Sequence, residues 1–416
     1  MERKAQAMKD YMLKQPKAWL KSDHVKDFTD FILPKDIEED GGYDSKEMLL
    51  EVEKNFIEAA KKNDVAGMKL LGRGVNVNAK NVNGRTALHY AVAFRNVEAV
   101  DMLLRRRAKL DLQDKEGLNM MHCAAMNNHT DIVAYIVDDL QIGELDKKDQ
   151  YGNRPFALAA AHGCVRMLEM LMEESYNMAT MEENEAGDTP LHLAAKNGQC
   201  EALQLLLNNF DIRNEVNQMG QTALHIATEM GKVDVVEMIL KAGVDLEIRD
   251  RQNKTALGVA ARGNMVIIVD MIIKAERYFR WKHNFQMTNT DAIESLHSES
   301  PLTFKLDHSP DTKPVRDIIW DLAYKHLKRN DWKKLAEYWE FTDDQVAAIE
   351  EQWTGPNSFQ EHGNRMLLIW LHGILIEGSS PSKGLYEGLL SAGITKIAEK
   401  IRMEGSNADT RKCMVS

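Results

Sequence analysis

Four histidines recur at one place in a repeating pattern, and a ladder of imidazole rings could bind metal ions. They are His89, His122, His192 and His225, separated by about 33 residues or by about twice that distance. Local zinc sites instead take neighbouring ligands from about two to five residues apart. Because buried polar side chains are normally satisfied by hydrogen bonds, we expect these rings to be structural and predict no metal or other cofactor.

The other residues that could support chemistry lack the spacing of catalytic motifs. No G-x-x-x-x-G-K-[ST] phosphate loop, H-E-x-x-H pair, G-x-S-x-G elbow or DNA-binding zinc finger occurs in the sequence. Cys123, Cys164, Cys200 and Cys413 form neither a C-x-x-C pair nor a disulfide framework, which is typical of a reducing compartment. A net charge of −11 argues against a nucleic-acid partner, which needs a basic face. The sequence thus predicts a protein that is not an enzyme.

These residues belong to a sequence repeat, which is clearest in the stretch GDTPLHLAAKNGQCEALQLLL. Copies of this stretch begin at Gly84, Gly117, Gly152, Gly187 and Gly220. The intervals between them are 33, 35, 35 and 33 residues. A fixed period of about 20 to 50 residues indicates an array of stacked structural units.

Residue types within one copy predict two short helices. Thr189 can cap the first helix, Pro190 suits its first turn, and Gly198 can adopt the left-handed conformation that ends it. The alanine and leucines of residues 202–206 give the second helix one apolar face. Short polar stretches of alternating character, such as residues 245–250, link the helix pairs and predict a short β-hairpin.

A period of about 33 residues with a Thr-Pro-Leu-His-x-Ala start resembles the ankyrin repeat. The resemblance covers residues 50–275 as an N-terminal cap and about six repeats. It implies a mainly α-helical solenoid in which the recurrent histidine bonds to neighbouring backbone and ties the repeats together. The last copy has Gly258 in the place of histidine and Asn264 in the place of glycine, as a terminal capping repeat would.

A second helical region follows the repeats. Residues 276–312 are polar in their second half and lack a clear helical period, which predicts a linker whose first aromatic residues can dock on the last repeat. Residues 313–405 contain helix-capping signals and apolar faces for about six short helices. The sequence therefore predicts a separate helical domain after the linker.

This second region carries a spaced set of tryptophans, leucines and acidic residues. The pattern W-x-x-LA…D…IE…ML-x-x-W…L-x-x-x-L…G…A, which begins at Trp332, resembles a death domain. An ankyrin array followed by such a domain is similar to the ankyrin repeat and death domain-containing protein family. The resemblance implies a six-helix death-domain bundle that docks with like domains in signalling complexes.

Charged side chains indicate how such docking would work. Basic residues gather around the first two helices of the bundle: Lys325, Lys328, Arg329, Lys333 and Lys334. Acidic residues gather on the third helix: Asp343, Asp344, Glu350 and Glu351. Opposite patches on one domain would allow homotypic head-to-tail self-association, whereas the alternative is that the charges are only solvated.

The ankyrin resemblance implies a second recognition surface, a groove of hairpin tips and first helices that binds a protein partner. The predicted tip residues are Asp114, Lys115, Lys148, Asp149, Glu183, Asn184, Asn217, Gln218, Asp250 and Arg251. Asn78 and Asn217 resemble the asparagines that an oxygen-dependent hydroxylase modifies in other ankyrin proteins. Asparagine is also favoured at such places by turn geometry.

The ends of the chain suggest a lipid anchor and two less structured segments. The final residues CMVS place Cys413 in a C-a-a-X prenylation motif, although one lipid alone anchors weakly. No apolar run is long enough for a membrane span, so we expect a cytoplasmic protein that meets a membrane only if Cys413 is prenylated. Residues 1–49 are expected to be a partly ordered extension and residues 406–416 a flexible tail.

These features together predict a non-catalytic intracellular signalling adaptor. Its ankyrin repeats would capture one protein, and its death domain would join a homotypic assembly. Two alternatives stay open: an inhibitory protein that sequesters a client through its ankyrin repeats while the C-terminal domain merely self-associates or caps the solenoid, and a prenylated membrane scaffold.

Overall fold

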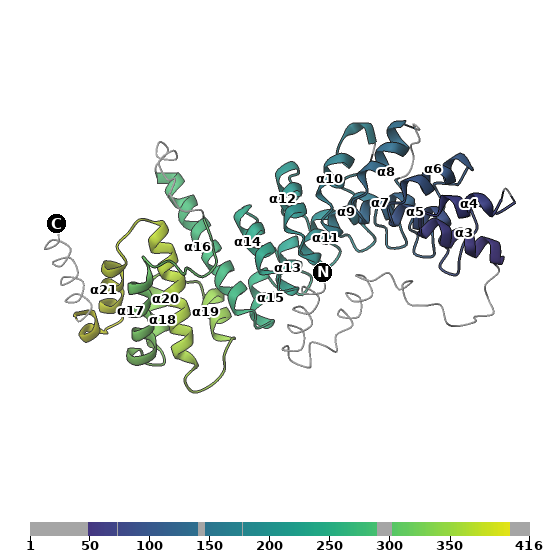
Figure 1. The fold of residues 1–416 in the computed structure, drawn as a ribbon. Helices are drawn as coiled ribbons and strands as arrows, with labels where there is room; N and C mark the ends of the chain where they lie inside the picture. The colour runs from purple at the N-terminus through teal and green to yellow at the C-terminus, as the bar shows by residue number, and fades with distance from the viewer. Residues whose placement is uncertain (1–48, 73, 140–145, 177, 289–301, 400–416) are drawn as a thin grey trace. The chain divides into compact units, whose positions relative to one another are not determined.

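The structure, a computed structural model, describes residues 49–72, 74–139, 146–176, 178–288 and 302–399 (Figure 1). Within these ranges every regular element is a helix. The described residues from Glu51 onward belong to one compact unit.

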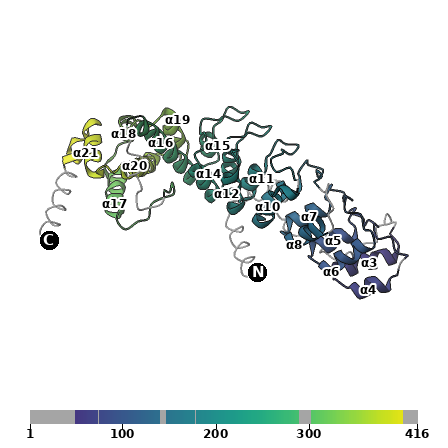
Figure 2. The ribbon, with the colours of Figure 1, turned by 90° about the horizontal axis from the view of Figure 1, so that it is seen from above.

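The first part of this unit is a row of helix pairs that follow one another in chain order (Figures 1 and 2). The pairs are α3 (Glu51–Lys61) with α4 (Val65–Leu70), α5 (Ala87–Ala93) with α6 (Val97–Arg105), α7 (Met120–Met126) with α8 (Thr130–Ala134), α9 (Pro155–His162) with α10 (Val165–Leu171), α11 (Pro190–Asn197) with α12 (Cys200–Asn209), α13 (Ala223–Glu229) with α14 (Val233–Lys241), and α15 (Ala256–Arg262) with α16 (Val266–Thr288). Each first helix contacts the first helix of the next pair, and second helices from α8 onward contact the second helix of the next pair. Their shared apolar faces therefore form one continuous core.

The predicted helix signals are confirmed in the fourth copy of the repeat. Thr189 is the extended residue before α11, and its backbone N–H donates to Nδ1 of His192 at 3.1 Å. Pro190 lies in the first turn, and Gly198 ends the helix with a φ of 77°. The histidine thus takes the place that Glu or Gln has in the usual capping box.

The recurrent histidines tie successive repeats together, as the ankyrin resemblance implied. In four copies Nε2 donates to a backbone carbonyl of the next repeat, with distances of 3.0, 3.3, 3.0 and 3.1 Å. The pairs are His89 with Leu118, His122 with Asn153, His192 with Gln221, and His225 with Lys254. Because Nδ1 accepts a backbone N–H in each copy, the proton lies on Nε2 and the ring is neutral. Burial lowers the pKa of all four rings.

The predicted β-hairpins are wrong in one respect, because no strand forms between the helix pairs of the described residues. Each connector ends in a tight turn, the tip, that is closed by very few backbone pairings. In the first tip, the Asn81 N–H donates to the Arg85 carbonyl at 2.9 Å and the Gly84 N–H donates to the Asn81 carbonyl at 2.8 Å. The Asn81 side chain accepts the other inward N–H groups, from Asn83 and Arg85, so no longer ladder can develop.

Successive tips touch through their backbones, which explains the recurrent glycine. The Gln150 N–H donates to the Glu116 carbonyl at 2.9 Å, and Gly117 has a φ of +80° beside this link. A Cβ atom on Gly117 would lie 2.6 Å from the Gln150 nitrogen. In the last repeat Asn253 takes the equivalent place with a φ of 60°. No seventh tip follows it in the described chain, so a side chain has room there.

The second part of the unit is a helical bundle of residues 313–399. Its helices are α17 (Lys313–Asp321) with a π-helical turn (Leu322–His326), α18 (Asp331–Tyr338), α19 (Asp343–Glu350), α20 (Ser358–Ile376), α21 (Pro381–Ser391), and helical residues 395–399. Trp332 and Trp370 are each only 1% exposed and form the centre of the bundle with Leu335 and Ile349. Trp339 stacks on Trp370 with ring centroids 4.3 Å apart.

The boundary between the two parts differs from the expected linker over residues 276–312. Helix α16 continues through position 276 and extends to Thr288. Residues 302–308 then pack against the repeats, with Phe304 fully buried. Figure 1 shows α16 lying between the last repeats and the bundle, and α16 contacts both α19 and α20.

Exchanging a tip glycine tests the tip-to-tip contact. We expect Gly117→Ala to destabilise the protein by about 2–5 kcal/mol, since the positive φ costs an L-residue about 1–2 kcal/mol and overpacking costs a further 1–3 kcal/mol. Gly231→Ala is the matched control, because Gly231 has a φ of +64° and open space around its Cβ position. Urea unfolding measures both, and equal losses would contradict the steric account.

The histidine ladder predicts a pH dependence with a defined sign. Because burial lowers the folded-state pKa of His89 below its ordinary value of 6.5, the unfolded chain takes up protons first as the pH falls. Stability is fully present above about pH 6.5 and is lost below it, with a slope of about 1.4 kcal/mol per pH unit for each such ring.

His89→Gln keeps a capping side chain but removes one titrating group. Urea unfolding between about pH 5 and pH 7.5 should show a slope that is lower by about one proton. The exposed His308, changed to Gln, is the control. An unchanged slope for His89→Gln would refute the neutral buried ring.

Candidate functional site

The tips place the predicted recognition residues in two classes. Each of these tips has two predicted residues next to each other in the sequence. One of the two closes the turn, because its side-chain Oδ1 accepts the backbone N–H groups two and four residues further along the chain. These turn-closing residues are Asp114, Asp149, Asn184, Asn217 and Asp250. Their neighbours carry exposed side chains: Lys115, Lys148, Glu183, Gln218 and Arg251. Only the second class can present its side chains to a partner.

Two apolar tip residues were missed by the sequence reasoning. Tyr151 is 61% exposed and Met219 is 50% exposed, each two residues after a turn-closing residue. The same register holds Asn83, Glu116, Ala186 and Gln252 in the other copies, so aligning the tips would have revealed the two large apolar side chains. An exposed tyrosine or methionine supplies contact area of the kind that protein interfaces use.

The two asparagines with a predicted modification lie at different positions of the repeat. Asn217 closes a tip turn, whereas Asn78 accepts the Lys109 N–H at 2.8 Å and so bonds to the next repeat. Asn214 is the structural counterpart of Asn78, because it accepts the Asp245 N–H at 2.8 Å. Cys413, the predicted prenylation site, lies outside the described residues.

The charged patches predicted on the bundle partly neutralise each other within the molecule. Lys333 Nζ lies 2.7 Å from Glu350 Oε1, so one member of each patch is already paired. Lys325 pairs with Asp321 at 2.5 Å, and Lys334 lies 3.8 Å from Asp331.

The remaining members of the two patches are exposed. On the basic side they are Lys328 and Arg329, and on the acidic side Asp343, Asp344 and Glu351. Of the acidic residues, Asp343 and Asp344 belong to the first turn of α19, which contacts α15 and α16 of the last repeat.

The junction between the last repeat and the bundle contains an ion pair of a buried arginine and a partly buried aspartate. Arg365 of α20 is 3% exposed, and its Nε and Nη2 both donate to Asp270 Oδ1 of α16, at 3.0 and 2.5 Å. The two residues are 95 positions apart in the chain. Since an isolated buried charge is costly, each partner depends on the other.

Three further polar contacts lie along the same face of α16. Glu276 accepts a hydrogen bond from the Gln345 amide at 2.8 Å. Arg277 donates to the Trp339 carbonyl at 3.0 Å and Arg280 donates to the Glu340 carbonyl at 3.3 Å. Because these carbonyls follow the last turn of α18, the two guanidinium groups act as cationic caps of that helix.

Residues 302–308, which we name the strap, extend the junction to an earlier repeat. Lys305 Nζ lies 2.7 Å from Asp234 Oδ1 and 2.9 Å from Glu237 Oε2 on α14. The Thr303 hydroxyl donates to Glu237 at 2.5 Å. Burial raises the pKa of Glu237, but hydrogen bonds from Lys305, Thr303 and Lys241 outweigh it and lower the pKa to about 2.

The strap also contacts α16 and the bundle. Lys274 Nζ of α16 donates to the carbonyls of Phe304 and Lys305 at 3.2 and 3.1 Å. His372 of α20 donates to the Thr303 carbonyl at 2.8 Å. The Phe304 ring lies 5.9 Å from the ring of His372 and 5.8 Å from that of Tyr278. One buried aromatic residue therefore touches both sides of the junction.

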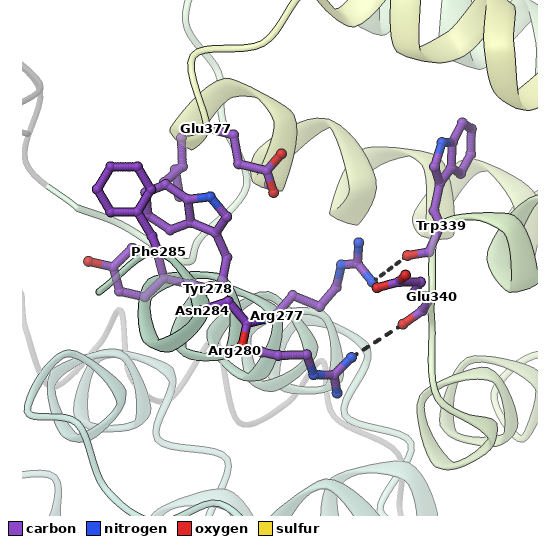
Figure 3. A pocket seen from close by; sticks show the side chains of 11 residues that line it. Arg277, Tyr278, Arg280, Asn284, Phe285, Trp339, Glu340 and Glu377 are labelled. Atoms are coloured by element: carbon purple, nitrogen blue, oxygen red, sulfur yellow. Dashed lines mark hydrogen bonds between the residues drawn. The ribbon is translucent and has the colours of Figure 1, made fainter. Parts of the chain in front are cut away.

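A pocket of about 360 Å³ opens along this junction (Figure 3). Arg277 and Arg280 reach from α16 toward the chain at Trp339 and Glu340, and Glu377 lies on the opposite wall. Aromatic rings of Tyr278, Trp281, Phe285 and Trp339 complete much of the lining. Both arginines already cap α18, and two carboxylates balance them, so the pocket has no strong net charge.

Burial changes the acid–base behaviour of the junction. It raises the pKa of Glu276 to about 7 and lowers that of Arg277 to about 10. It also lowers the pKa of Lys274 and that of His372, the latter to about 4. Each shift disfavours the charged form, so docking removes water from these groups at a free-energy cost.

The described part of the chain offers neither a metal site nor a membrane span. No group of three or more His, Cys, Asp and Glu side chains is placed there to hold a metal ion. No helix among the described residues is both long enough and apolar enough to cross a bilayer.

Comparison with known proteins identifies the family to which the repeats are similar. A family model described as ankyrin repeats (3 copies) matches residues 56–149, 136–216, 156–250 and 191–284, which together exceed half of the 416 residues. A segment of 87 residues is 36% identical to Notch-regulated ankyrin repeat-containing protein A of Danio rerio and covers 20% of this chain and 78% of that protein. The Homo sapiens Notch-regulated ankyrin repeat-containing protein is 33% identical over 87 residues, which cover 20% and 76% of the two chains.

A solved structure is also similar to about half of this chain. The ankyrin repeat domain of human ASB11 aligns with a TM-score of 0.44 and 25% identity. The alignment covers 49% of this chain and 90% of that chain.

The ion pair of Asp270 and Arg365 predicts a difference between removing one partner and replacing both. Asp270→Ala leaves Arg365 charged and unpaired, which costs about 3–5 kcal/mol as long as the junction stays closed. We expect the junction to open instead, so that hydrogen exchange at α15 and α19 becomes more than about a hundredfold faster, since 1.4 kcal/mol is tenfold. Asp270→Leu combined with Arg365→Met should keep the exchange slow.

The exposed pair of Lys383 and Glu387, 4.0 Å apart, supplies the control. Lys383→Ala should change stability by less than about 1 kcal/mol. If Asp270→Ala left exchange at α15 and α19 as slow as this control does, the ion pair would not hold the junction.

Proposed function

The chain belongs to the ankyrin-repeat family, and from this we propose that it is a non-catalytic signalling adaptor whose repeats capture a protein partner and whose C-terminal bundle is a death domain that joins a homotypic assembly. Ankyrin repeats are protein-interaction modules. Two relatives that are named Notch-regulated ankyrin repeat-containing proteins support a role in signalling or its regulation.

The observation that carries the proposal is the pair of exposed apolar side chains on the tips. Tyr151 and Met219 project from turns that are fixed by Asp149 and Asn217, so they are presented without flexible backbone. Preorganised side chains lose little entropy on binding. With the exposed charges of Lys115 and Lys148 they offer a mixed apolar and polar surface suited to a folded or extended protein segment.

The core of the bundle supports the death-domain part of the proposal. The residues that carry the resemblance are at most 2% exposed at its apolar positions: Trp332, Leu335, Ala336, Ile349, Met366, Leu367, Trp370, Leu385, Leu389 and Ala398. The pattern therefore reflects a packed core of helices. Exposed Lys328 and Arg329 on one side and Glu351 on another give the bundle opposite charges of the kind that steer association between copies.

The packing at the junction favours a second candidate, an inhibitory protein that sequesters a client. Here the bundle acts only as a cap on the last repeat, whose helix α16 would otherwise expose its outer face. The ion pair of Asp270 and Arg365, which joins the bundle to α16, supports this second candidate.

Two sets of surface substitutions distinguish the candidates. Tyr151→Ser with Met219→Ser should remove one set of neighbours in proximity labelling, because loss of interface anchors costs about 2 kcal/mol or more and thus over tenfold in affinity. Lys328→Glu with Arg329→Glu should remove a different set if the chain is an adaptor. A sequestering protein would respond only to the first pair of substitutions.

Lys383→Glu, an exposed change on α21, should leave both sets intact. Labelling that is unchanged by both double substitutions would reject the adaptor and the sequestering protein alike. The thermal unfolding midpoint of each variant is measured alongside, since surface changes should alter stability by less than about 0.5 kcal/mol.

A further inference from the structure

The junction is a contact between the bundle and its own ankyrin array, and it covers a definite part of the bundle. Gln345 at the start of α19 is 0% exposed and Arg365 in the middle of α20 is 3% exposed. Both polar side chains meet residues of α16, Glu276 and Asp270. The face made by the start of α19 and the middle of α20, which we name the docked face, is therefore closed to other molecules.

The docked face is joined to the array by several polar contacts, beside the packing of Phe304. It is joined to α16 by the Asp270–Arg365 pair and the Glu276–Gln345 hydrogen bond, and α16 also caps α18 through Arg277 and Arg280. The strap adds Lys305 against Asp234 and Glu237. Water can satisfy all of these groups when the surfaces separate, which makes a polar contact between domains easier to open than an apolar core.

Two unsatisfied polar atoms in the described part of the junction oppose closure. Among the described residues, Arg277 Nε and Arg365 Nη1 are buried without a hydrogen-bond partner. A donor that loses its water on docking and gains no new acceptor raises the free energy of the docked state. Burial also raises the pKa of Glu276 and lowers the pKa of Lys274 and of His372, so that the neutral form of each group is favoured. These desolvation costs oppose the favourable contacts of the closed junction.

The docked face adjoins charges that a second copy would use. Asp343 and Asp344 lie in the first turn of α19, next to Gln345, and Asp344 is close enough to raise the pKa of Glu276 electrostatically, although burial is the larger cause. Helix α19 contacts α15 and α16 on this side. A partner approaching the acidic turn would thus meet the last repeat.

We propose that the last ankyrin repeat and the strap form an autoinhibitory clasp, which masks the docked face of the bundle and must open before the bundle can dock with a second copy of this chain. The inference rests on the proposed self-association of the bundle. It adds that the ankyrin array regulates that step within the same molecule. An event that weakens the strap or the α16 contacts releases the bundle.

Charge reversal in the strap provides the test on the full-length chain. Lys305→Glu places a third carboxylate beside Asp234 and Glu237, and Arg280→Glu removes one cap of α18; both residues are at the surface and outside the two cores. We expect this double variant to exchange amide hydrogens at least tenfold faster at both α15 and α19. We also expect it to self-associate at a concentration at least tenfold lower than the wild type in sedimentation velocity.

Two further variants control for nonspecific effects. Lys305→Glu with Asp234→Lys restores an opposite-charge pair and should exchange more slowly and associate more weakly than Lys305→Glu alone. Lys383→Glu, with the same change of charge on α21, should behave as the wild type in both measurements. Equal behaviour of the rescued and unrescued strap variants would overturn the role of the strap.

The outcomes separate the clasp from the proposed function. Faster exchange with unchanged sedimentation means that opening exposes no association surface, which overturns the clasp as an inhibitor. Unchanged exchange, or a wild type that associates as strongly as the double variant, overturns it too. Adding Lys328→Glu and Arg329→Glu to the open variant tests the association surface separately: loss of association supports both ideas, whereas persistent association supports the clasp and rejects the proposed basic surface.

Discussion

The structure depends on the fact that no repeat can satisfy its own polar groups or bury its own apolar stripe. The imidazole of His89 needs the Leu118 carbonyl of the next repeat, and the Gln150 N–H of one tip needs the Glu116 carbonyl of the tip before it. Every contact of this kind points to a neighbour. An array built in this way is stable in its middle and must be modified at its ends.

The last repeat shows how the C-terminal end is modified. Gly258 replaces the histidine that would have no carbonyl to reach, and Asn253 replaces the tip glycine where no further tip approaches. Part of the outer side of α16 is covered by α19 and α20, and Lys274 of α16 donates hydrogen bonds to the strap. The bundle thus takes the place of a further repeat. It does so with ion pairs and carbonyl caps in addition to Phe304, and this difference in chemistry distinguishes the junction from the core of the array.

The sequence was sufficient to predict the local features that recur in each repeat. It was insufficient to predict contacts between residues that are far apart in the chain. Capping residues such as Thr189 and Pro190, and the tryptophans of the bundle, could be predicted because propensity and period act over a few residues. The tip strands were predicted wrongly, since side-chain bonds from residues such as Asn81 replaced the backbone ladder. The pairing of Asp270 with Arg365 could not be predicted across 95 positions. Its one local signal was a charge inside the apolar run VIIVDMIIKA, which in hindsight marks a buried partner.

The same reasoning explains why the region after residue 275 was expected to be a linker. A helix with one buried face has a clear apolar period, but α16 changes its surroundings along its length. Its first part is buried among helices of the array, with Ile268, Met271 and Ile273 at most 2% exposed on several sides. Its later part meets the bundle through Glu276, Arg277 and Arg280. A helix that packs first against the array and then against the bundle does not keep one apolar period along its whole length. The lack of a clear period in this region is therefore a consequence of the junction.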